Sequence, residues 1–183
     1  MDRKDALELV KKHVKTKNLI KHMLAAEAVM ASLANRLGED EKKWALAGLL
    51  HDVDYDETVN HPDRHSLVGG ELLEELGIEE DIVYAVKAHN EYHGLPRKSL
   101  LDKALWAVDP LTGLLVAAAL IHPEKKLKAI DVGFVMNRFK ESSFAKGASR
   151  DQIKSCKELG LELEEFIGIA LNAMQNISTK LGL

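Results

Sequence analysis

Apolar residues recur every three or four positions along almost the whole chain, and this helical period limits the fold more than any other feature. No segment alternates between apolar and polar residues for long enough to form a sheet. The period predicts helices at about residues 7–14, 19–37, 40–53, 62–76, 79–90, 99–121, 129–140, 149–159 and 162–180. The last three ranges correspond to two or three helices, so we predict an all-α fold, a bundle of about eight helices.

Size and cysteine content indicate one compact domain in a reducing compartment. A chain of 183 residues with 46% hydrophobic side chains can bury a substantial core, so we expect a single domain over residues 1–183. The single cysteine, Cys156, excludes an internal disulfide, and the first residues lack the apolar core of a secretory signal, which predicts a cytoplasmic protein. Asp109, Pro110 and Gly113 interrupt the apolar run 104–121, which therefore predicts a core helix bent at Pro110, not a membrane span.

The charges are segregated along the chain. The formal net charge of -4 argues against general binding of nucleic acids. Residues 51–81 hold eleven acids and one base, whereas residues 123–157 hold nine bases and four acids. An acidic surface suits hard cations, and a basic surface facing it would suit a phosphorylated small molecule. Two solvated helical faces of opposite sign explain the pattern equally well.

Imidazole and carboxylate side chains recur on the predicted helices, at His22, His51, Asp52, His65, His89 and Asp109. Burying an isolated carboxylate is costly, so Asp109, with Val108 and Leu111 beside it, should be paired or bound to a metal ion. His51 and Asp52 are about 100° apart around a helix, so both can reach one ion at the helix end. The set is typical of a metal site.

The series His22, then His51-Asp52, then Asp109 resembles the H…HD…D signature of the HD phosphohydrolase superfamily, whose fold is a helical bundle with the metal between helices. His65 and His89 match a variant of that family with two further histidines. The resemblance covers about residues 18–120, the expected metal-binding core, on which the helices of residues 129–180 would pack. The segment from Asp5 to Val29 also resembles bacterial HD-type diadenosine polyphosphate hydrolases.

The resemblance implies a ligand set and a reaction. His22, His51, Asp52 and Asp109 would hold one metal ion, and Asp52 would bridge to a second ion held by His65 and His89. Such ligands accept Fe, Mn, Zn, Ni or Co, as one or two divalent ions. A water molecule activated by the metal, its pKa lowered from about 15.7 to about 7, would attack a phosphate ester or anhydride, in a phosphomonoester or a nucleotide.

The chain also departs from the family pattern. Many members follow the His-Asp pair with an apolar residue, glycine and then lysine or histidine, whereas this chain reads Val53-Asp54-Tyr55. A lysine that contacts phosphate is therefore missing there. His89-Asn90 replaces the paired histidines of some members, which favours two metal ions over three. These departures leave the substrate open.

Several other side chains have two possible interpretations. His61 and His93 lie four residues from His65 and His89, so the ligand within each pair stays open. His93 is also a candidate catalytic residue alongside Asp52, as the general acid that protonates the leaving oxygen; an exposed loop histidine is the alternative.

The loops hold further candidates. Lys146 and Arg150, near the helix start at Ser149, are candidate substrate ligands for a phosphate, and an ordinary loop with an N-cap is the alternative. Asp54 and its acidic neighbours predict a solvated loop, from which one carboxylate could orient a ligand histidine.

Two other functions fit the same residues. Some HD proteins use a mixed-valence di-iron site to activate oxygen, which would make this chain an oxygenase. A regulatory module that binds metal and nucleotide without catalysis is the second rival. The sequence leaves the oligomeric state open.

Overall fold

The computed structural model describes residues 1–183, and it is helical throughout, with no strand. The all-α prediction is confirmed. The first part of the chain forms α1 (Arg3–His13), α2 (Lys17–Leu37), α3 (Glu41–Leu50), α4 (Tyr55–Thr58), α5 (Leu67–Glu75) and α6 (Glu80–Ala88). There follow the 3-10 turn η1 (Glu91–His93), α7 (Leu100–Ile121), η2 (Leu127–Ala129) and α8 (Val132–Lys140). The last elements are α9 (Arg150–Lys154), η3 (Ser155–Leu159), α10 (Leu163–Asn176) and α11 (Ser178–Leu181).

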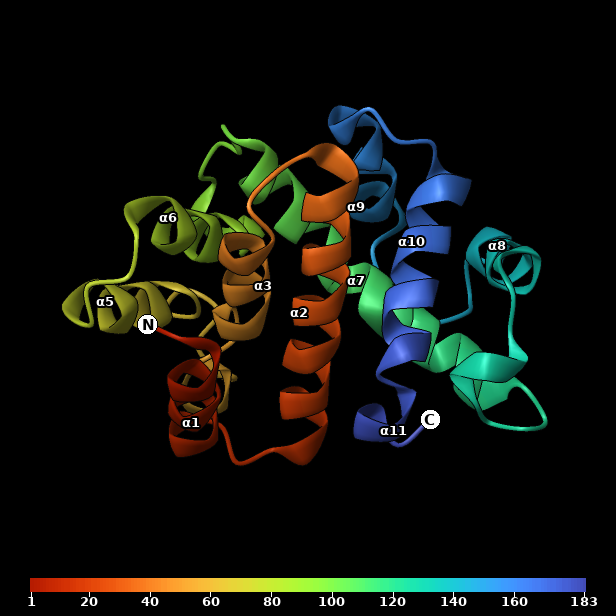
Figure 1. The fold of residues 1–183 in the computed structure, drawn as a ribbon, viewed down its shortest axis with the longest axis horizontal. Coiled ribbons are helices and arrows are strands. Elements are labelled where there is room, and N and C mark those ends of the chain that lie inside the picture. The colour runs from red at the N-terminus through yellow and green to blue at the C-terminus, as the bar shows by residue number, and fades with distance from the viewer.

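Helix α2 lies at the centre of the bundle. It has α3 on one side and α10 on the other, and α7 crosses behind it (Figure 1). Helices α5 and α6 lie beyond α3, α8 lies at the opposite end, and α9 lies near the top of the view between α2 and α10. Buried apolar side chains from α1 to α11 form one continuous core, from Ala6 to Leu181.

The close approach of α2 and α3 depends on a glycine. A Cβ atom added to Gly48 would lie 2.7 Å from the carbonyl oxygen of Ala26. Gly38, in the left-handed conformation, ends α2, and the side chain of Asp40 accepts the amide hydrogen of Lys43 to begin α3. This tight hairpin brings the first turns of α2 beside the C-terminal end of α3.

Helix α7 is the predicted core helix. Ser99 and Asp102 form a capping box at its start, and the helix continues through Pro110. Pro110 has no amide hydrogen for the carbonyl of Trp106, which instead accepts from the side chain of Gln152 at 3.5 Å. By length and composition α7 is long and apolar enough to cross a membrane, but 61% of its most apolar window is buried within the bundle.

The segment of residues 54–63, predicted as a solvated loop, differs most from expectation. It contains the one-turn helix α4, and Asp54 and Thr58 are buried. The next helix begins at Leu67 rather than near Pro62, because Ser66 adopts a left-handed φ of 68° that interrupts the helix. The last predicted helix is also divided, at Ile177, into α10 and α11.

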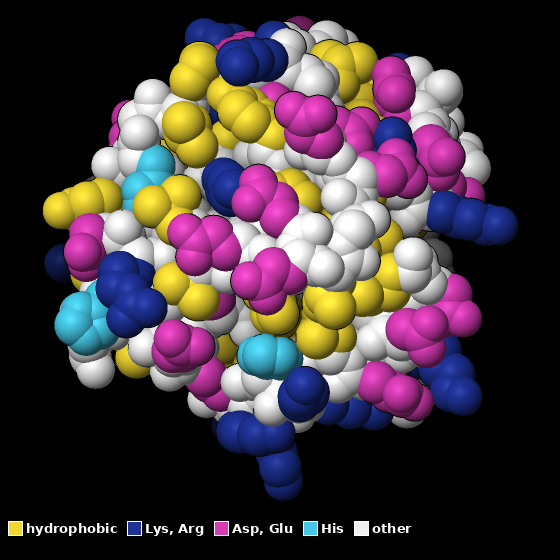
Figure 2. Space-filling model, turned by 90° about the vertical axis from the view of Figure 1, so that its left-hand side faces the viewer, with side chains coloured by type: hydrophobic (Ala, Val, Ile, Leu, Met, Phe, Trp, Pro, Cys, Tyr) yellow, Lys and Arg dark blue, Asp and Glu magenta, His cyan; other side chains and the backbone are white.

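The acidic segment of residues 51–81 is partly neutralised on the surface. Figure 2 shows acidic side chains interspersed with basic and apolar ones on the face that α5 and α6 form. Lys43 lies 2.6 Å from Glu79 and 2.8 Å from Asp81, and Lys87 lies 2.7 Å from Glu74. On this face the solvated alternative describes the charges better than a single acidic patch.

Candidate metal centre

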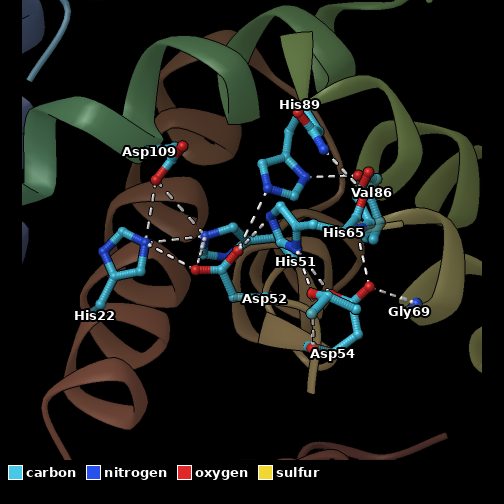
Figure 3. Close-up of polar contacts among 12 residues, drawn as sticks. His22, His51, Asp52, Asp54, His65, Gly69, Val86, His89 and Asp109 are labelled. Carbon is cyan, nitrogen blue, oxygen red and sulfur yellow. Dashed lines mark hydrogen bonds and ion pairs between the residues drawn. The ribbon is translucent and has the colours of Figure 1, made fainter. Parts of the chain in front are cut away.

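Helices and turns far apart in the sequence carry the six predicted ligands to one place (Figure 3). Helix α2 supplies His22, and His51 and Asp52 directly follow α3. The turn before α5 and the end of α6 supply His65 and His89, and the middle of α7 supplies Asp109. The structure thus brings together all six residues of the series.

Asp52 lies between two pairs of histidines. Its Oδ2 atom is 3.5 Å from Nε2 of His22 and 3.5 Å from Nε2 of His51. Its Oδ1 atom is 3.4 Å from Nε2 of both His65 and His89. Asp109 Oδ1 joins the first pair, at 3.1 Å from His22 Nε2. The six side chains therefore form two ligand groups that share one carboxylate.

The other ring nitrogen of each histidine has its own partner in the protein. Nδ1 of His51 donates to the carbonyl of Gly48 at 2.8 Å, and Nδ1 of His89 donates to that of Val86 at 2.6 Å. Nδ1 of His22 lies 2.9 Å from Oγ1 of Thr112, which donates its own hydrogen to the carbonyl of Asp109. Nδ1 of His65 lies 3.1 Å from Oδ1 of Asp54. These partners hold the proton on Nδ1 and direct the Nε2 lone pairs inward.

The donor atoms fit a divalent cation. Nε2 of His22 and Nε2 of His51 face each other at 3.0 Å, with carboxylate oxygens beside them. Two lone pairs in that arrangement repel each other unless a proton or a cation lies between them, and His51 has no exposed surface. Mixed imidazole and carboxylate ligands suit divalent transition metals, without selecting among Fe, Mn, Zn, Ni and Co.

The electrostatics of the centre also favour positive charge. Burial alone would lower the pKa of His51, but Asp52 and Asp109 outweigh burial and raise that pKa above its ordinary value. Burial opposes ionisation of Asp109, yet hydrogen bonds from protons on Nε2 of His22 and His51, which a bound cation would displace, hold its pKa well below the ordinary value. Burial likewise opposes ionisation of Asp52, but the charge of His51 and the hydrogen bond from His89 lower its pKa. Both carboxylates are therefore charged and available to a cation at neutral pH.

The alternative histidines lie outside the two ligand groups. His61 is exposed, whereas His65 and His89 each point Nε2 at Asp52. Nε2 of His93 donates to the carbonyl oxygen of His65 at 2.7 Å. The ring of His93 is thus hydrogen-bonded to the backbone, and its role as a general acid stays a prediction.

Only one of the two predicted phosphate ligands lies at the centre. Lys146, which is exposed, lines a cavity of about 380 Å³ together with His22, Asp109 and Pro110. The guanidinium of Arg150 instead donates to backbone carbonyls of the preceding segment: those of Arg138, Phe139, Glu141, Phe144, Ala145 and Ala148. Arg150 holds that segment together, and its binding to a phosphate stays a prediction, as does that of Lys146.

The sequence does not point to Thr112, whereas Asp54 belongs to the acidic loop in which one carboxylate could orient a ligand histidine, and Asp54 does contact Nδ1 of His65. Thr112 lies three residues after Asp109, so helical spacing alone places it on the same side of α7. Asp54 sits in a polar segment with no period, and only the folded turn shows that its side chain is buried.

Fold and centre together define the class: an all-α metal-binding protein with the ligand chemistry of a metal-dependent hydrolase. The sequence profile of the HD domain matches residues 19–132, more than half of the chain. The chain therefore belongs to the HD domain family.

Several curated relatives are bacterial enzymes named ribonuclease Y. That of Oleidesulfovibrio alaskensis is 35% identical over 100 residues, which cover 54% of this chain and 18% of the relative. The Lawsonia intracellularis protein is 33% identical over 118 residues, and the Desulfotalea psychrophila protein is 32% identical over 139 residues. These two matches cover 63% and 73% of this chain, but 22% and 26% of the relatives. The chain thus corresponds to about a quarter or less of the length of these relatives.

Proposed function

We propose that this protein is a metal-dependent phosphohydrolase that cleaves a phosphate ester or anhydride of a small molecule, such as a phosphomonoester or a nucleotide. The observation that carries the proposal is the position of Asp52, whose two oxygens face different pairs of imidazole nitrogens. A carboxylate so placed is suited to bridge two cations. Two-ion centres are a common solution for phosphoryl transfer to water.

The side chains divide the remaining work. When bound, two divalent cations held by these ligands would supply activated water and neutralise charge on the attacking and leaving oxygens. Asp52 and the four histidines would hold the cations in place. Because water is the nucleophile, no side chain has to attack the substrate. The cavity beside His22 and Asp109 admits the phosphoryl group, and the ammonium group of Lys146 offsets its charge there.

Leaving-group protonation is assigned to His93 in this proposal. Its Nε2 atom is bonded to the carbonyl of His65, so the ring has to leave that carbonyl before it can give a proton to the substrate. Histidine side chains commonly serve as general acids close to neutral pH.

The test begins with elemental analysis of protein purified without oxygen, followed by a screen for phosphate release from nucleotides with the metals found. We expect turnover by the wild-type protein, and we expect Asp52→Ala and His51→Ala to lose both bound metal and turnover. Full activity of metal-free Asp52→Ala protein would overturn the proposal. Oxygen consumption without phosphate release would favour a di-iron oxygenase, and tight nucleotide binding without turnover would favour a regulatory module.

A second candidate function is cleavage of RNA, favoured by the name of the relatives, ribonuclease Y. The net charge of -4 opposes it, because binding to phosphate backbones relies on a positive surface. Single-stranded RNA oligonucleotides, assayed beside mononucleotides at the same ionic strength, separate the two. Faster cleavage of the oligonucleotide, lost in Asp52→Ala, would establish the ribonuclease and displace the small-molecule substrate.

A further inference from the structure

Polar side chains on two sides of the turn that carries His65 form hydrogen bonds with it. We propose that Asp54, Asn90 and His93 form a clamp that positions His65 and thereby builds the half of the centre formed by Asp52, His65 and His89. The proposal rests on the two-ion centre of the proposed function. It assigns His93 a positioning role within the protein, in addition to or instead of proton transfer.

The first arm of the clamp is the carboxylate of Asp54, which is 4% exposed. Its Oδ2 atom accepts the amide hydrogens of Ser66 at 2.8 Å and Gly69 at 2.9 Å, while Oδ1 faces Nδ1 of His65 at 3.1 Å (Figure 3). The other three ligand histidines direct Nδ1 at a neutral oxygen. A carboxylate partner fixes the orientation of the ring and makes its Nε2 a stronger electron-pair donor to a metal ion. His65 is therefore the histidine whose ligand strength depends most on its partner.

The backbone of the turn is strained where Asp54 holds it. Ser66 has a φ of 68°, a left-handed conformation that side chains other than glycine rarely adopt. A Cβ atom added to Gly69 would lie 3.1 Å from Cγ of Asp54, a tight contact, so the absence of a side chain at residue 69 favours the close approach of the carboxylate to the first turn of α5. Strain of this kind persists where surrounding contacts enforce it, and the two amide contacts of Asp54 do so here.

The second arm holds the carbonyl oxygen of His65. That oxygen accepts from Nδ2 of Asn90 at 2.9 Å and from Nε2 of His93 at 2.7 Å. Nδ2 of Asn90 also donates to the carbonyl of Pro62 at 2.9 Å. Asn90 directly follows His89, so the segment that supplies one ligand of this half also holds the turn that supplies the other.

The first test compares two conservative variants that each change the Nδ1 partner of one histidine. Asp54→Asn removes the charge and one of the two acceptor oxygens, so the amide oxygen cannot serve both His65 and the backbone amides of Ser66 and Gly69, and Thr112→Val removes the hydroxyl beside His22. Metal-free protein is titrated with Mn²⁺ in equilibrium dialysis, and electron paramagnetic resonance reports whether the bound ions are isolated or coupled in pairs. In Asp54→Asn we expect the affinity for one of two ions to fall about 10–100-fold, with the spectrum of an isolated ion at intermediate Mn²⁺. Thr112→Val, the matched control, should weaken the half that contains His22.

The second test separates positioning by His93 from proton transfer. Glutamine can offer an N–H donor near the place of Nε2, whereas alanine cannot. If His93 is part of the clamp, His93→Ala loses affinity for one ion and His93→Gln regains most of it. If His93 acts only as a general acid, both variants bind two ions as tightly as the wild-type protein and both lose turnover.

The outcomes distinguish the clamp from the proposed function. Two ions bound with wild-type affinity and a coupled spectrum in both Asp54→Asn and His93→Ala would overturn the clamp. A wild-type protein that binds two ions but releases no phosphate would overturn the proposed function and leave the clamp intact. A wild-type protein that binds one ion would overturn both.

Retention of one tightly bound ion shows that a variant is folded, and Asn90→Ala replaces Asp54→Asn if the latter does not fold.

Discussion

At the scale of single residues, Asp52 joins two halves of one centre. Its two oxygens each face two imidazole nitrogens at 3.4–3.5 Å, which no other side chain of the centre does. The order of the histidines and aspartates in the sequence predicts this set, because the family resemblance assigns each a helix. The sequence offers a carboxylate of the Asp54 segment to orient a ligand histidine, but it does not identify which histidine, and it does not point to Thr112, since both partners reach their histidines through tertiary contacts.

Lys146 offers a test of how the substrate phosphate is held. It is exposed and lines the cavity beside His22 and Asp109. Removing a solvated charge of this kind costs about 1 kcal/mol, so we expect Lys146→Ala to raise KM for the phosphorylated substrate about fivefold with kcat little changed. Steady-state kinetics at low and high salt check this, with Lys126→Ala, an exposed lysine outside that cavity, as the control. Equal KM values in the two variants would remove Lys146 from the binding site.

At the scale of elements, the helices follow the apolar period closely, and the turns do not. The period places α2, α3, α6 and α7 correctly because their apolar residues pack into the core: α2 and α6 bury one apolar face, whereas α3 and α7 are buried around more of their circumference. It misses α4 and the late start of α5, because there the backbone conformation depends on hydrogen bonds of Asp54 to Ser66 and Gly69. Contacts between residues distant in sequence leave no local pattern.

The junction of α2 and α3 predicts a large effect for a small substitution. A methyl group at Gly48 meets the backbone of Ala26 at 2.7 Å, so Gly48→Ala should destabilise the fold by about 1–3 kcal/mol through overpacking. Gly113→Ala, with nothing within 4 Å on helix α7, should instead stabilise it by about 0.5–1 kcal/mol. Urea unfolding of both metal-free variants measures the difference. Equal stability of the two variants would contradict the packing described for α2 and α3.

Asp56 links α4 to the start of α2 and predicts a pH dependence. Burial would raise its pKa, but the amides of Thr16 and Lys15 outweigh burial and lower it below the ordinary 3.8. Because the folded pKa is the lower one, its contribution to stability is present above about pH 4 and disappears as the pH falls through the folded pKa.

We therefore expect Asp56→Asn to cost about 1 kcal/mol near pH 7 and progressively less as the pH falls below 4. Chemical unfolding at a series of pH values, compared with the wild-type protein, checks this. A cost that stays constant down to acid pH would show that the charge of Asp56 plays no part.

At the scale of the whole molecule, the centre ties α2, α3, α6 and α7 together through contacts between histidines and the two carboxylates of Asp52 and Asp109. A cation that binds only the folded state at 100 times its Kd adds about 2.7 kcal/mol to the stability. Each kcal/mol shifts the Tm of a domain of this size by about 2–4 °C. We expect a chelator to lower the Tm of the metal-loaded protein by about 5–10 °C, and to have no effect on His51→Ala. If chelation leaves the Tm of the metal-loaded protein unchanged, metal binding does not stabilise the fold.

The most direct test of the two-ion centre is anomalous diffraction from crystals of the Mn²⁺-loaded protein. A two-ion centre predicts two anomalous peaks roughly 3.5–4 Å apart, one on each side of the Asp52 carboxylate. One peak should lie within bonding distance of His22, His51 and Asp109, and the other within bonding distance of His65 and His89. A single peak, or two peaks that Asp52 does not join, would contradict it.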